Sequence, residues 1–370
     1  MRKLTKLELH GFKSIRHLAD FKLGPLNILI GVNGAGKSNL ISFFKLINWM
    51  TPSPGNLQFY IGKSGGANVL LHDGVATTPQ LEAILTFETD AGVNEYSMRL
   101  FHAAPDTLIF ADEKYRFSRH TSGGKADWKL LGAGHREARL VEVAEEGDQT
   151  AKTILWLMKG CVVYQFHNTS DTARIRQRWD VEDNRFLKED AANLAPFLLR
   201  LRDTQPKAYS RIVETLRQIA PFFADFVLEP LGDTVILQWR ERNSDIIFGP
   251  HQASDGTLRV MALVSLLLQP EEDLPTVVIL DEPELGLHPY AIHVVAGLLK
   301  SIATRTQVIL ATQSMTFVDC FEPEHIIVVS RPGRESTFKR LDSERLKEWL
   351  EEYSLAELWE KNVLGGRPAS

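Results

Sequence analysis

Short apolar runs near the amino terminus alternate with turns and predict three strands followed by a helix. The runs at 4–9 and 17–23 are interrupted by charged residues, whereas 26–30 is almost continuously apolar, as expected of a buried parallel strand. A glycine-rich turn then opens helical spacing over 39–48. The segment 51–66 is rich in Pro, Gly and Ser, and we expect a mobile loop there.

The middle of the chain changes from strand periodicity to helix periodicity. Alternating apolar and polar positions predict an antiparallel part, and apolar spacings of three and four residues further on predict a helical lobe with boundaries at Pro206 and Pro221. The expected elements are strands at 81–89, 95–101, 108–116 and 161–166, and helices at 150–158, 193–202 and 207–219.

Beyond residue 226 strands alternate with helices, which predicts a mostly parallel sheet. The expected strands are 226–229, 235–239, 276–280, 308–311 and 326–330, and the expected helices are 255–269 and 290–304. A tail over 343–361 has helical spacing and ends at Gly365-Gly366. The fold class that follows is α/β, interrupted by an antiparallel β lobe and an inserted helical lobe.

Composition excludes several classes of protein. The chain has 370 residues, of which 44% are hydrophobic and 24% charged, so it is globular rather than disordered. Cys161 and Cys320 stand far apart without C-x-x-C spacing, which excludes a disulfide framework and a zinc cluster and fits a cytoplasmic location. The longest apolar run, 260–268, is half of what a bilayer span needs, so we expect no membrane partner.

The charge distribution limits any contact with nucleic acid to one region. A formal charge of −5 argues against a uniformly basic surface. The segment 112–139 nevertheless has seven Lys or Arg against four Asp or Glu, interleaved with Tyr115, Phe117 and Trp128. It is either an ordinary solvated face or a contact for a phosphate backbone.

The sequence GVNGAGKS at 31–38 fits the phosphate-binding pattern G-x-x-x-x-G-K-[ST], after a buried strand and before a helix. Backbone N–H groups in such a turn surround phosphates, Lys37 is expected to be an exposed ligand of the β and γ phosphates, and Ser38 is expected to bind Mg²⁺. Lys13 is a further candidate at the border of the nucleotide. The expected phosphate contacts from the turn are Asn33, Gly34, Ala35, Gly36, Lys37, Ser38 and Asn39.

A second motif places two acids after an apolar strand. Residues 277–280 are all apolar, and Asp281 and Glu282 follow at the end where α/β sheets bind ligands. We expect Asp281 to hold Mg²⁺ and Glu282 to activate the water that attacks the γ phosphate. The alternative is a helix N-cap, which Pro283 would suit.

A third motif, S-D-G-T at 254–257, stands before the apolar helix at 260–268. Ser254 is a good N-cap, and a serine followed by a glycine at a helix start is also a second phosphate-binding surface. One subunit cannot easily direct both surfaces at one nucleotide. Two chains that face each other could do so.

Together with D-E-P-E-L-G-L-H-P at 281–289 and A-T-Q-S at 311–314, these motifs resemble the ABC-type ATPase heads of the RecF, SMC and OLD group, and more closely its stand-alone bacterial members. The resemblance implies a P-loop NTPase fold in which Ser254 and Gly256 contact the γ phosphate held by the opposite subunit. It places Glu282 at the catalytic base, Gln313 at the switch histidine and His288 at the D-loop aspartate.

The resemblance also implies a division of the chain and leaves one motif open. The expected segments are the first part of the ATPase head at 1–100, an inserted β and helical lobe at 101–225, the second part of the head at 226–335 and a helical tail at 336–370. The Q-loop glutamine is not placed, with Gln58 and Gln80 as the alternatives. No Toprim nuclease domain is expected after the tail.

The implied function is binding and hydrolysis of ATP with Mg²⁺, which closes a homodimer head to head. The implied role is that of a switch subunit in DNA repair or anti-phage defence, with a separately encoded nuclease-type effector and DNA as candidate partners. The alternative is an ATP-binding module that does not hydrolyse, because a glutamine at 313 cannot titrate. A transporter ATPase fits less well because no L-S-G-G-Q signature is present, and no [NT]-K-x-D motif supports a GTPase.

Overall fold

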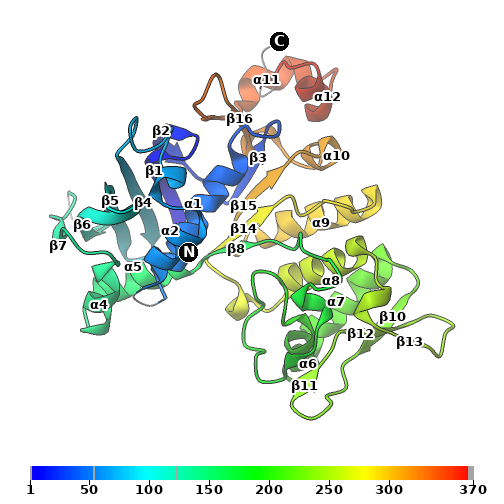
Figure 1. The fold of residues 1–370 in the computed structure, drawn as a ribbon. Coiled ribbons are helices and arrows are strands. Elements are labelled where there is room, and N and C mark those ends of the chain that lie inside the picture. The colour runs from blue at the N-terminus through cyan, green and yellow to red at the C-terminus, as the bar shows by residue number, and fades with distance from the viewer. Residues whose placement is uncertain (1, 53–54, 122–123, 366–370) are drawn as a thin grey trace.

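A computed structural model describes residues 2–52, 55–121 and 124–365, so Gly366, the expected end of the tail, lies outside the described residues. Two six-stranded sheets organise the chain. Figure 1 shows an antiparallel sheet on one side, a second sheet in the centre, a helical lobe below it and the carboxyl-terminal helices at the top.

The central sheet is the predicted parallel one, and that prediction is confirmed. Its strands, in spatial order, are β17 (Thr337–Arg340), β16 (Ile326–Ser330), β3 (Leu26–Ile30), β15 (Gln307–Thr312), β14 (Val277–Asp281) and β8 (Cys161–Tyr164). All neighbouring pairs are parallel except β16 and β17. The carboxyl ends of the parallel strands therefore meet at one edge, which is where ligands bind in sheets of this kind.

The second sheet is antiparallel, as the middle of the sequence predicts. Its order is β2 (Ile15–Lys22), β1 (Lys3–Phe12), β4 (Gln80–Thr89), β5 (Gly92–Ala103), β6 (Thr107–Arg119) and β7 (Lys129–Gly132). The side-chain amide of Gln307, on β15, bonds to both the N–H and the C=O of Leu4 at 2.9 Å and so links the two sheets. The boundary that we expected at residue 100 falls within β5.

The two faces of the central sheet bury two separate cores. Because successive side chains of a strand point to opposite faces, Val278 and Leu280 pack toward one core while Val277 and Ile279 pack toward the other. Helices α1 (Lys37–Met50) and α5 (Gln149–Lys159) supply the core shared with the antiparallel sheet. The turn that begins α1 is therefore held between two sheets.

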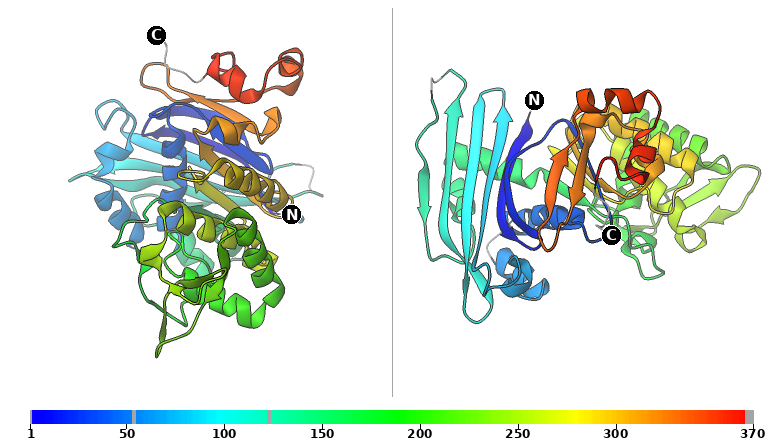
Figure 2. Two further views of the ribbon diagram at one scale, coloured as in Figure 1. Left: turned by 90° about the vertical axis from the view of Figure 1, so that its right-hand side faces the viewer. Right: turned by 90° about the horizontal axis from the view of Figure 1, so that it is seen from above.

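The other face carries the helical lobe, which Figure 2 shows on one side of the central sheet. Its apolar side chains share one core with β14 and β15. The elements on this side are α6 (Leu194–Thr204), α7 (Pro206–Ile219), α8 (Asp255–Leu268) and α9 (Pro289–Ile302), with short strands β9 (Trp179–Asp180), β10 (Phe223–Val227), β11 (Thr234–Val235), β12 (Gln238–Glu241) and β13 (Ile247–Phe248).

One expectation about local structure is wrong. The segment 51–66, expected to be a loop, contains helix α2 (Asn56–Lys63), because Leu57 and Ile61 bury one face and the Glu137 carboxylate accepts from the N–H groups of Leu57 and Gln58 at 3.1 Å. A residue far along the sequence thus caps this helix. The tail is helical as expected and consists of two helices, α11 (Ser343–Leu350) and α12 (Leu355–Glu360), because Ser354 forms a capping box that starts the second.

The remaining helices are short. They are α3 (Ala67–Leu70), α4 (Arg139–Glu145) and α10 (Met315–Val318), with 3₁₀ turns at Arg174–Arg176, Pro250–Gln252, Glu271–Asp273 and Pro323–His325. No helix among the described residues is long and apolar enough to cross a membrane.

A fully buried carboxylate fixes α4 to the antiparallel sheet. Glu113, on β6, accepts from the Tyr96 hydroxyl at 2.8 Å and lies 2.7 Å from Nε2 of His135. It also accepts from the backbone N–H groups of Arg139 and Leu140, which start α4. Because both oxygens are satisfied by several donors, the cost of burying this group is offset.

We therefore expect Glu113→Ala to lower the free energy of unfolding by about 3 kcal/mol, since it leaves buried donors without an acceptor. Urea unfolding followed by circular dichroism measures the change. Lys129→Ala is the control, because its 2.9 Å pair with Asp148 is exposed and should contribute less than about 1 kcal/mol. Equal losses for the two variants would show that Glu113 has no special structural role.

Candidate nucleotide-binding site

The glycine-rich turn lies between the end of β3 and the start of α1, where the sequence places it. Three of its glycines have positive φ angles, and a Cβ at Gly31 or Gly36 would collide with Val329 O or with Ser336 Oγ. Only glycine fits these two positions. The backbone of Asn33 and Gly34 is left exposed at the mouth of the turn, as a phosphate cradle requires.

Lys37 is buried, which corrects our expectation of an exposed lysine. It is 4% exposed, and its ammonium donates to Gly31 O at 2.6 Å and to Val32 O at 3.2 Å. Burial lowers the pKa of this ammonium, while Glu282 and Asp281 act in the opposite direction. The ammonium thus lies inside the turn, along the carbonyls that flank the cradle.

The two residues expected to bind a metal lie together. Ser38 Oγ is 3.4 Å from Asp281 Oδ1, although the residues are 243 positions apart. The second oxygen, Asp281 Oδ2, accepts from Gln165 Nε2 at 3.0 Å, and the backbone oxygen of Asp281 lies 2.7 Å from Nε2 of His167. Burial raises the pKa of the Asp281 carboxyl, and His167 opposes that shift.

Gln165 is the site residue that the sequence interpretation missed. It follows β8 directly, and its Oε1 accepts from Lys45 on α1. Gln58 and Gln80, the two alternatives considered, do not contact this site: Gln58 bonds to Leu108 and Arg136, and Gln80 to Glu82. The signal in the sequence was a glutamine at the carboxyl end of a strand. It was missed because the predicted strand, 161–166, extends two residues beyond β8 and therefore includes Gln165.

Glu282 and Gln313 meet at the ends of adjacent strands. Gln313 Nε2 donates to Glu282 Oε1, and Glu282 N donates to Ala311 O at 2.8 Å. Glu282 has a φ of 43°, a left-handed conformation that is uncommon for a residue other than glycine. The hydrogen bond from Glu282 N to Ala311 O holds this strained backbone. In this conformation the Glu282 carboxylate points toward Gln313.

Glu284 is a further acid that the motif analysis left without a role. It is 7% exposed, one oxygen accepts from Thr312 Oγ1, and burial raises the pKa of its carboxyl. Among the residues that the structure describes, its other oxygen has no hydrogen-bond partner. Glu284 therefore fastens the loop after β14 to the end of β15, next to Gln313.

The S-D-G-T motif at 254–257, which we call the signature turn, lies at the amino end of α8. Ser254 is the N-cap, its Oγ accepts from Thr257 N at 3.1 Å, and its side chain is exposed. Gly256 packs so closely that a Cβ would lie 2.6 Å from Gly286 O. His288 caps α9 in the same way, with its Nδ1 accepting from Tyr290 N at 3.3 Å. Ser254 therefore caps α8, as the helix-cap interpretation predicts, and it is also exposed to solvent.

The start of α1 is also tied to the turn between β1 and β2. Asn39 Nδ2 donates to Ser14 Oγ at 2.6 Å, and Ser336 Oγ lies 2.6 Å from that hydroxyl and donates to Ala35 O. Lys13 donates to Ser42 Oγ at 2.6 Å, one turn beyond Ser38 on α1. Its role at the nucleotide stays a prediction.

The oxygen atoms present suit a magnesium ion that arrives with a nucleotide. Ser38 and Asp281 offer a hydroxyl and a carboxylate, and Mg²⁺ is commonly bound by one or two such groups together with substrate phosphates. Among residues 2–52, 55–121 and 124–365, no group of three or more His, Cys, Asp or Glu is placed to hold a metal ion.

A cavity of about 860 Å³ lies elsewhere in the molecule. Gly160 and Thr276, at the beginnings of β8 and β14, line it together with Phe186 and Lys188 of the helical lobe. The P-loop and Asp281 are at the opposite ends of these parallel strands, so the cavity is separate from the nucleotide site.

The fold and these motifs define the P-loop NTPase class of proteins. Residues 26–319 match the protein family described as "AAA domain, putative AbiEii toxin, Type IV TA system". Because this match spans most of the 370 residues, the chain belongs to that family.

Solved structures of SMC heads share the fold. A SmcHead bound to the C-winged helix domain of ScpA aligns with a TM-score of 0.61 at 17% identity, over 93% of this chain and 99% of that one. The Smc head domain from Pyrococcus furiosus, bound to the C-terminal domain of ScpA, aligns with a TM-score of 0.57 at 16% identity, over 95% and 99%. Identities this low carry the fold alone.

Curated relatives match over a shorter stretch. The energy-coupling factor transporter ATP-binding protein EcfA2 of Staphylococcus aureus is 34% identical over 107 residues, which is 27% of this chain and 35% of that protein. The match therefore spans about a third of the length of this relative.

Lys37→Met should abolish tight ATP binding without unfolding the protein, because it keeps the buried stem and removes only the ammonium. Loss of charge-assisted hydrogen bonds should weaken binding by at least about tenfold. Titration with a fluorescent ATP analogue measures affinity, and circular dichroism checks the fold. Lys159→Met, an exposed position on α5, is the control. Unchanged affinity in a folded Lys37→Met protein would remove the P-loop assignment.

Proposed function

We propose that this protein binds and hydrolyses ATP with Mg²⁺ and that ATP closes two copies head to head, as a switch. The observation that carries the proposal is the meeting of Ser38, Gln165 and Asp281 at one edge of the central sheet. A hydroxyl from the P-loop, an amide from β8 and a carboxylate from β14 converge on one point. Ser38 and Asp281 would hold a cation that binds together with the phosphates of a nucleotide.

Binding would use the P-loop and its lysine. Backbone N–H groups from Asn33 to Asn39 would surround the phosphates, and Lys37 would donate to them in place of Gly31 O and Val32 O. Bound Mg²⁺ would neutralise part of the phosphate charge. Ser38 and Asp281 would hold that ion. Burial raises the pKa of the Asp281 carboxyl, and the charge of a bound cation would oppose this shift and favour the ionised carboxylate.

Hydrolysis would depend on Glu282, which lies one residue beyond the metal ligand. Its carboxylate is half-buried at the end of β14 and would accept a proton from the attacking water. The amide of Gln313 already donates to this carboxylate, so Gln313 orients the base. Because an amide does not titrate, Gln313 would position groups without transferring a proton.

The signature turn supplies the argument for a dimer. Ser254 is exposed at the amino end of α8, where backbone N–H groups and the helix dipole attract an anion. Its polar contacts are with Thr257, on the same turn, and not with the P-loop. A second copy related by two-fold symmetry would place its nucleotide against this turn and so form two composite sites.

The output of closure would be a change of shape that another protein detects. We assign the role of a switch subunit in DNA repair or anti-phage defence, with a separate nuclease-type effector and DNA as candidate partners. Membership of a family described as putative AbiEii toxin supports a defence role. The basic segment 112–139 gives weaker support for DNA, because Lys114, Arg116 and Lys129 are already paired with acids.

A second candidate function is ATP binding without turnover. It is favoured by the hydrogen bond from Gln313 to Glu282, which occupies an oxygen of the carboxylate that would accept the proton. In that case ATP would still close the dimer, and its release would reopen it.

Glu282→Gln separates the two candidates. It should retain ATP and lower the hydrolysis rate by at least about 100-fold, since a general base contributes that much. With ATP trapped, the variant should form dimers at micromolar concentration, measured by light scattering. Glu271→Gln, an exposed acid in the loop before β14, is the matched control and should behave as the unchanged protein.

Three results would contradict the proposal or a part of it. Hydrolysis at the unchanged rate in Glu282→Gln would make this residue a structural cap, and an unchanged protein with no turnover would favour the second candidate. Persistent monomers of Glu282→Gln at saturating ATP would remove the head-to-head dimer under either candidate.

A further inference from the structure

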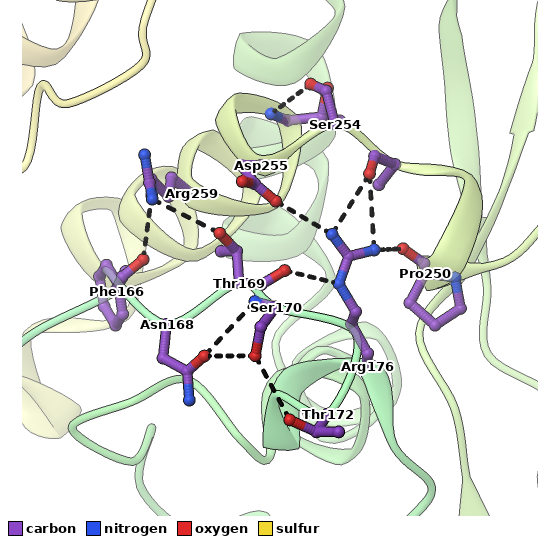
Figure 3. Close-up of polar contacts among 12 residues, drawn as sticks. Phe166, Asn168, Thr169, Ser170, Thr172, Arg176, Pro250, Ser254, Asp255 and Arg259 are labelled. Carbon is purple, nitrogen blue, oxygen red and sulfur yellow. Dashed lines mark hydrogen bonds and ion pairs between the residues drawn. The ribbon is translucent and has the colours of Figure 1, made fainter.

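One arginine on the signature helix, α8, contacts two loops at once. Arg259, on the first turn of α8, donates from Nε to Phe166 O at 3.2 Å and from Nη2 to His167 O at 3.1 Å. Nη1 donates to Leu285 O at 2.8 Å. Figure 3 shows the side chain extending from α8 toward Phe166 and Thr169. All three guanidinium nitrogens therefore donate to backbone carbonyls, and Nη2 also donates to the Thr169 hydroxyl.

The segment that Arg259 holds is the one that carries the metal-site glutamine. Gln165 donates to Asp281 Oδ2 at 3.0 Å, and His167 Nε2 lies 2.7 Å from Asp281 O. Side chains of this segment thus bind the end of β14, and its carbonyls bind Arg259. Three consecutive residues connect the carboxylate of the metal site to the helix of the signature turn.

The third carbonyl connects the same arginine to the loop after β14. A Cβ on Gly286, which has a φ of 76°, would lie 3.0 Å from Arg259 Nη1, so glycine keeps the path of the guanidinium open. A Cβ on Gly256 would meet the backbone oxygen of Gly286. The signature turn, Arg259 and this loop are therefore packed as one unit.

A second arginine fastens the same turn and meets the segment after β8 at Thr169 rather than at residues 166 and 167. Arg176 is 5% exposed and donates to Thr169 O at 2.8 Å, to Pro250 O and to Asp255 Oδ1 at 3.1 Å. Figure 3 shows it on the opposite side of the turn from Arg259. Arg176 holds the turn in shape, whereas Arg259 joins it to residues 166 and 167.

We propose that Arg259 is a positioning residue that couples nucleotide and metal at one composite site to the signature turn serving the other. This inference rests on the proposed head-to-head dimer. In each copy, Asp281 belongs to the site of its own P-loop, and Ser254 faces the nucleotide of the partner copy. Arg259 connects the metal site to the signature turn through the carbonyls of residues 166 and 167. Binding of nucleotide and metal at one composite site therefore positions the signature turn that serves the other site.

Cooperative closure follows from this connection. Gln165 and the segment behind it would move when a cation binds at Asp281, and the planar fork of Arg259 would transmit this movement to α8 because it bonds both carbonyls simultaneously. The first ATP then improves the site for the second. Couplings of this kind typically change affinity by between about 5-fold and 150-fold.

The test compares ATP-driven dimerisation of Glu282→Gln with that of Glu282→Gln/Arg259→Gln. At nanomolar protein, where chains are monomeric, a fluorescent ATP analogue should bind both with the same affinity, within about twofold. At micromolar protein, light scattering should show that Arg259→Gln raises the half-maximal ATP concentration by about tenfold. The Hill coefficient should fall from above 1 to about 1.

Three comparison variants separate coupling from general damage. Arg240→Gln removes an exposed arginine from the same lobe and should change neither the midpoint nor the steepness. Arg176→Gln loosens the turn, so it should raise the midpoint and keep the steepness. Arg259→Lys should fall between, since a single ammonium nitrogen cannot occupy the three positions from which Nε, Nη1 and Nη2 donate, and it serves also if Arg259→Gln fails to fold.

The outcomes distinguish failure of the coupling by Arg259 from failure of the proposed head-to-head dimer on which it rests. If Glu282→Gln remains monomeric with ATP, the proposed dimer fails and the coupling with it. If Glu282→Gln dimerises cooperatively and the Arg259 variants do so with the same midpoint and Hill coefficient, only the coupling is wrong. An equal loss of steepness in Arg176→Gln would also overturn it, because rigidity of the turn would then suffice.

Discussion

The structure depends on one buried carboxylate, that of Asp281. Burial disfavours its charge, and donors from α1 and from the segment after β8 offset that cost. Ser38 approaches one oxygen from α1, Gln165 donates to the other from the end of β8, and His167 contacts the backbone oxygen. The central sheet makes this possible, because its parallel strands end at one edge and bring segments that are far apart in sequence to a single point.

The two sheets and the helical lobe explain how a change at that point would be transmitted in the proposed switch. Helix α1 is held between the sheets, so the P-loop is rigid, whereas α8 and its signature turn belong to the core on the other face. The contacts of Arg259 bridge these parts through backbone carbonyls near the site. A change at Asp281 can therefore reach Ser254 without passing through either apolar core.

Local patterns predicted the central sheet, the P-loop and the acids after β14, because each of these signals lies within a few adjacent residues. What could not be predicted depends on distant partners. Glu137 caps α2 from far along the chain, so a segment rich in Pro and Gly is helical. Lys37 is buried because carbonyls of its own turn surround it. Gln165 has meaning only beside Asp281, which the sequence places 116 residues away.

The central claim is that the P-loop of one copy faces the signature turn of another. Thiol cross-linking tests it in a Glu282→Gln background with Cys320→Ser, leaving only the buried native Cys161. One chain carries Asn33→Cys and the other Ser254→Cys, both at exposed positions. With ATP and Mg²⁺, a short bifunctional maleimide should join the two different chains, and Lys37→Met in both chains should abolish the product. Cross-linking that is absent with ATP, or equal without it, would contradict the account.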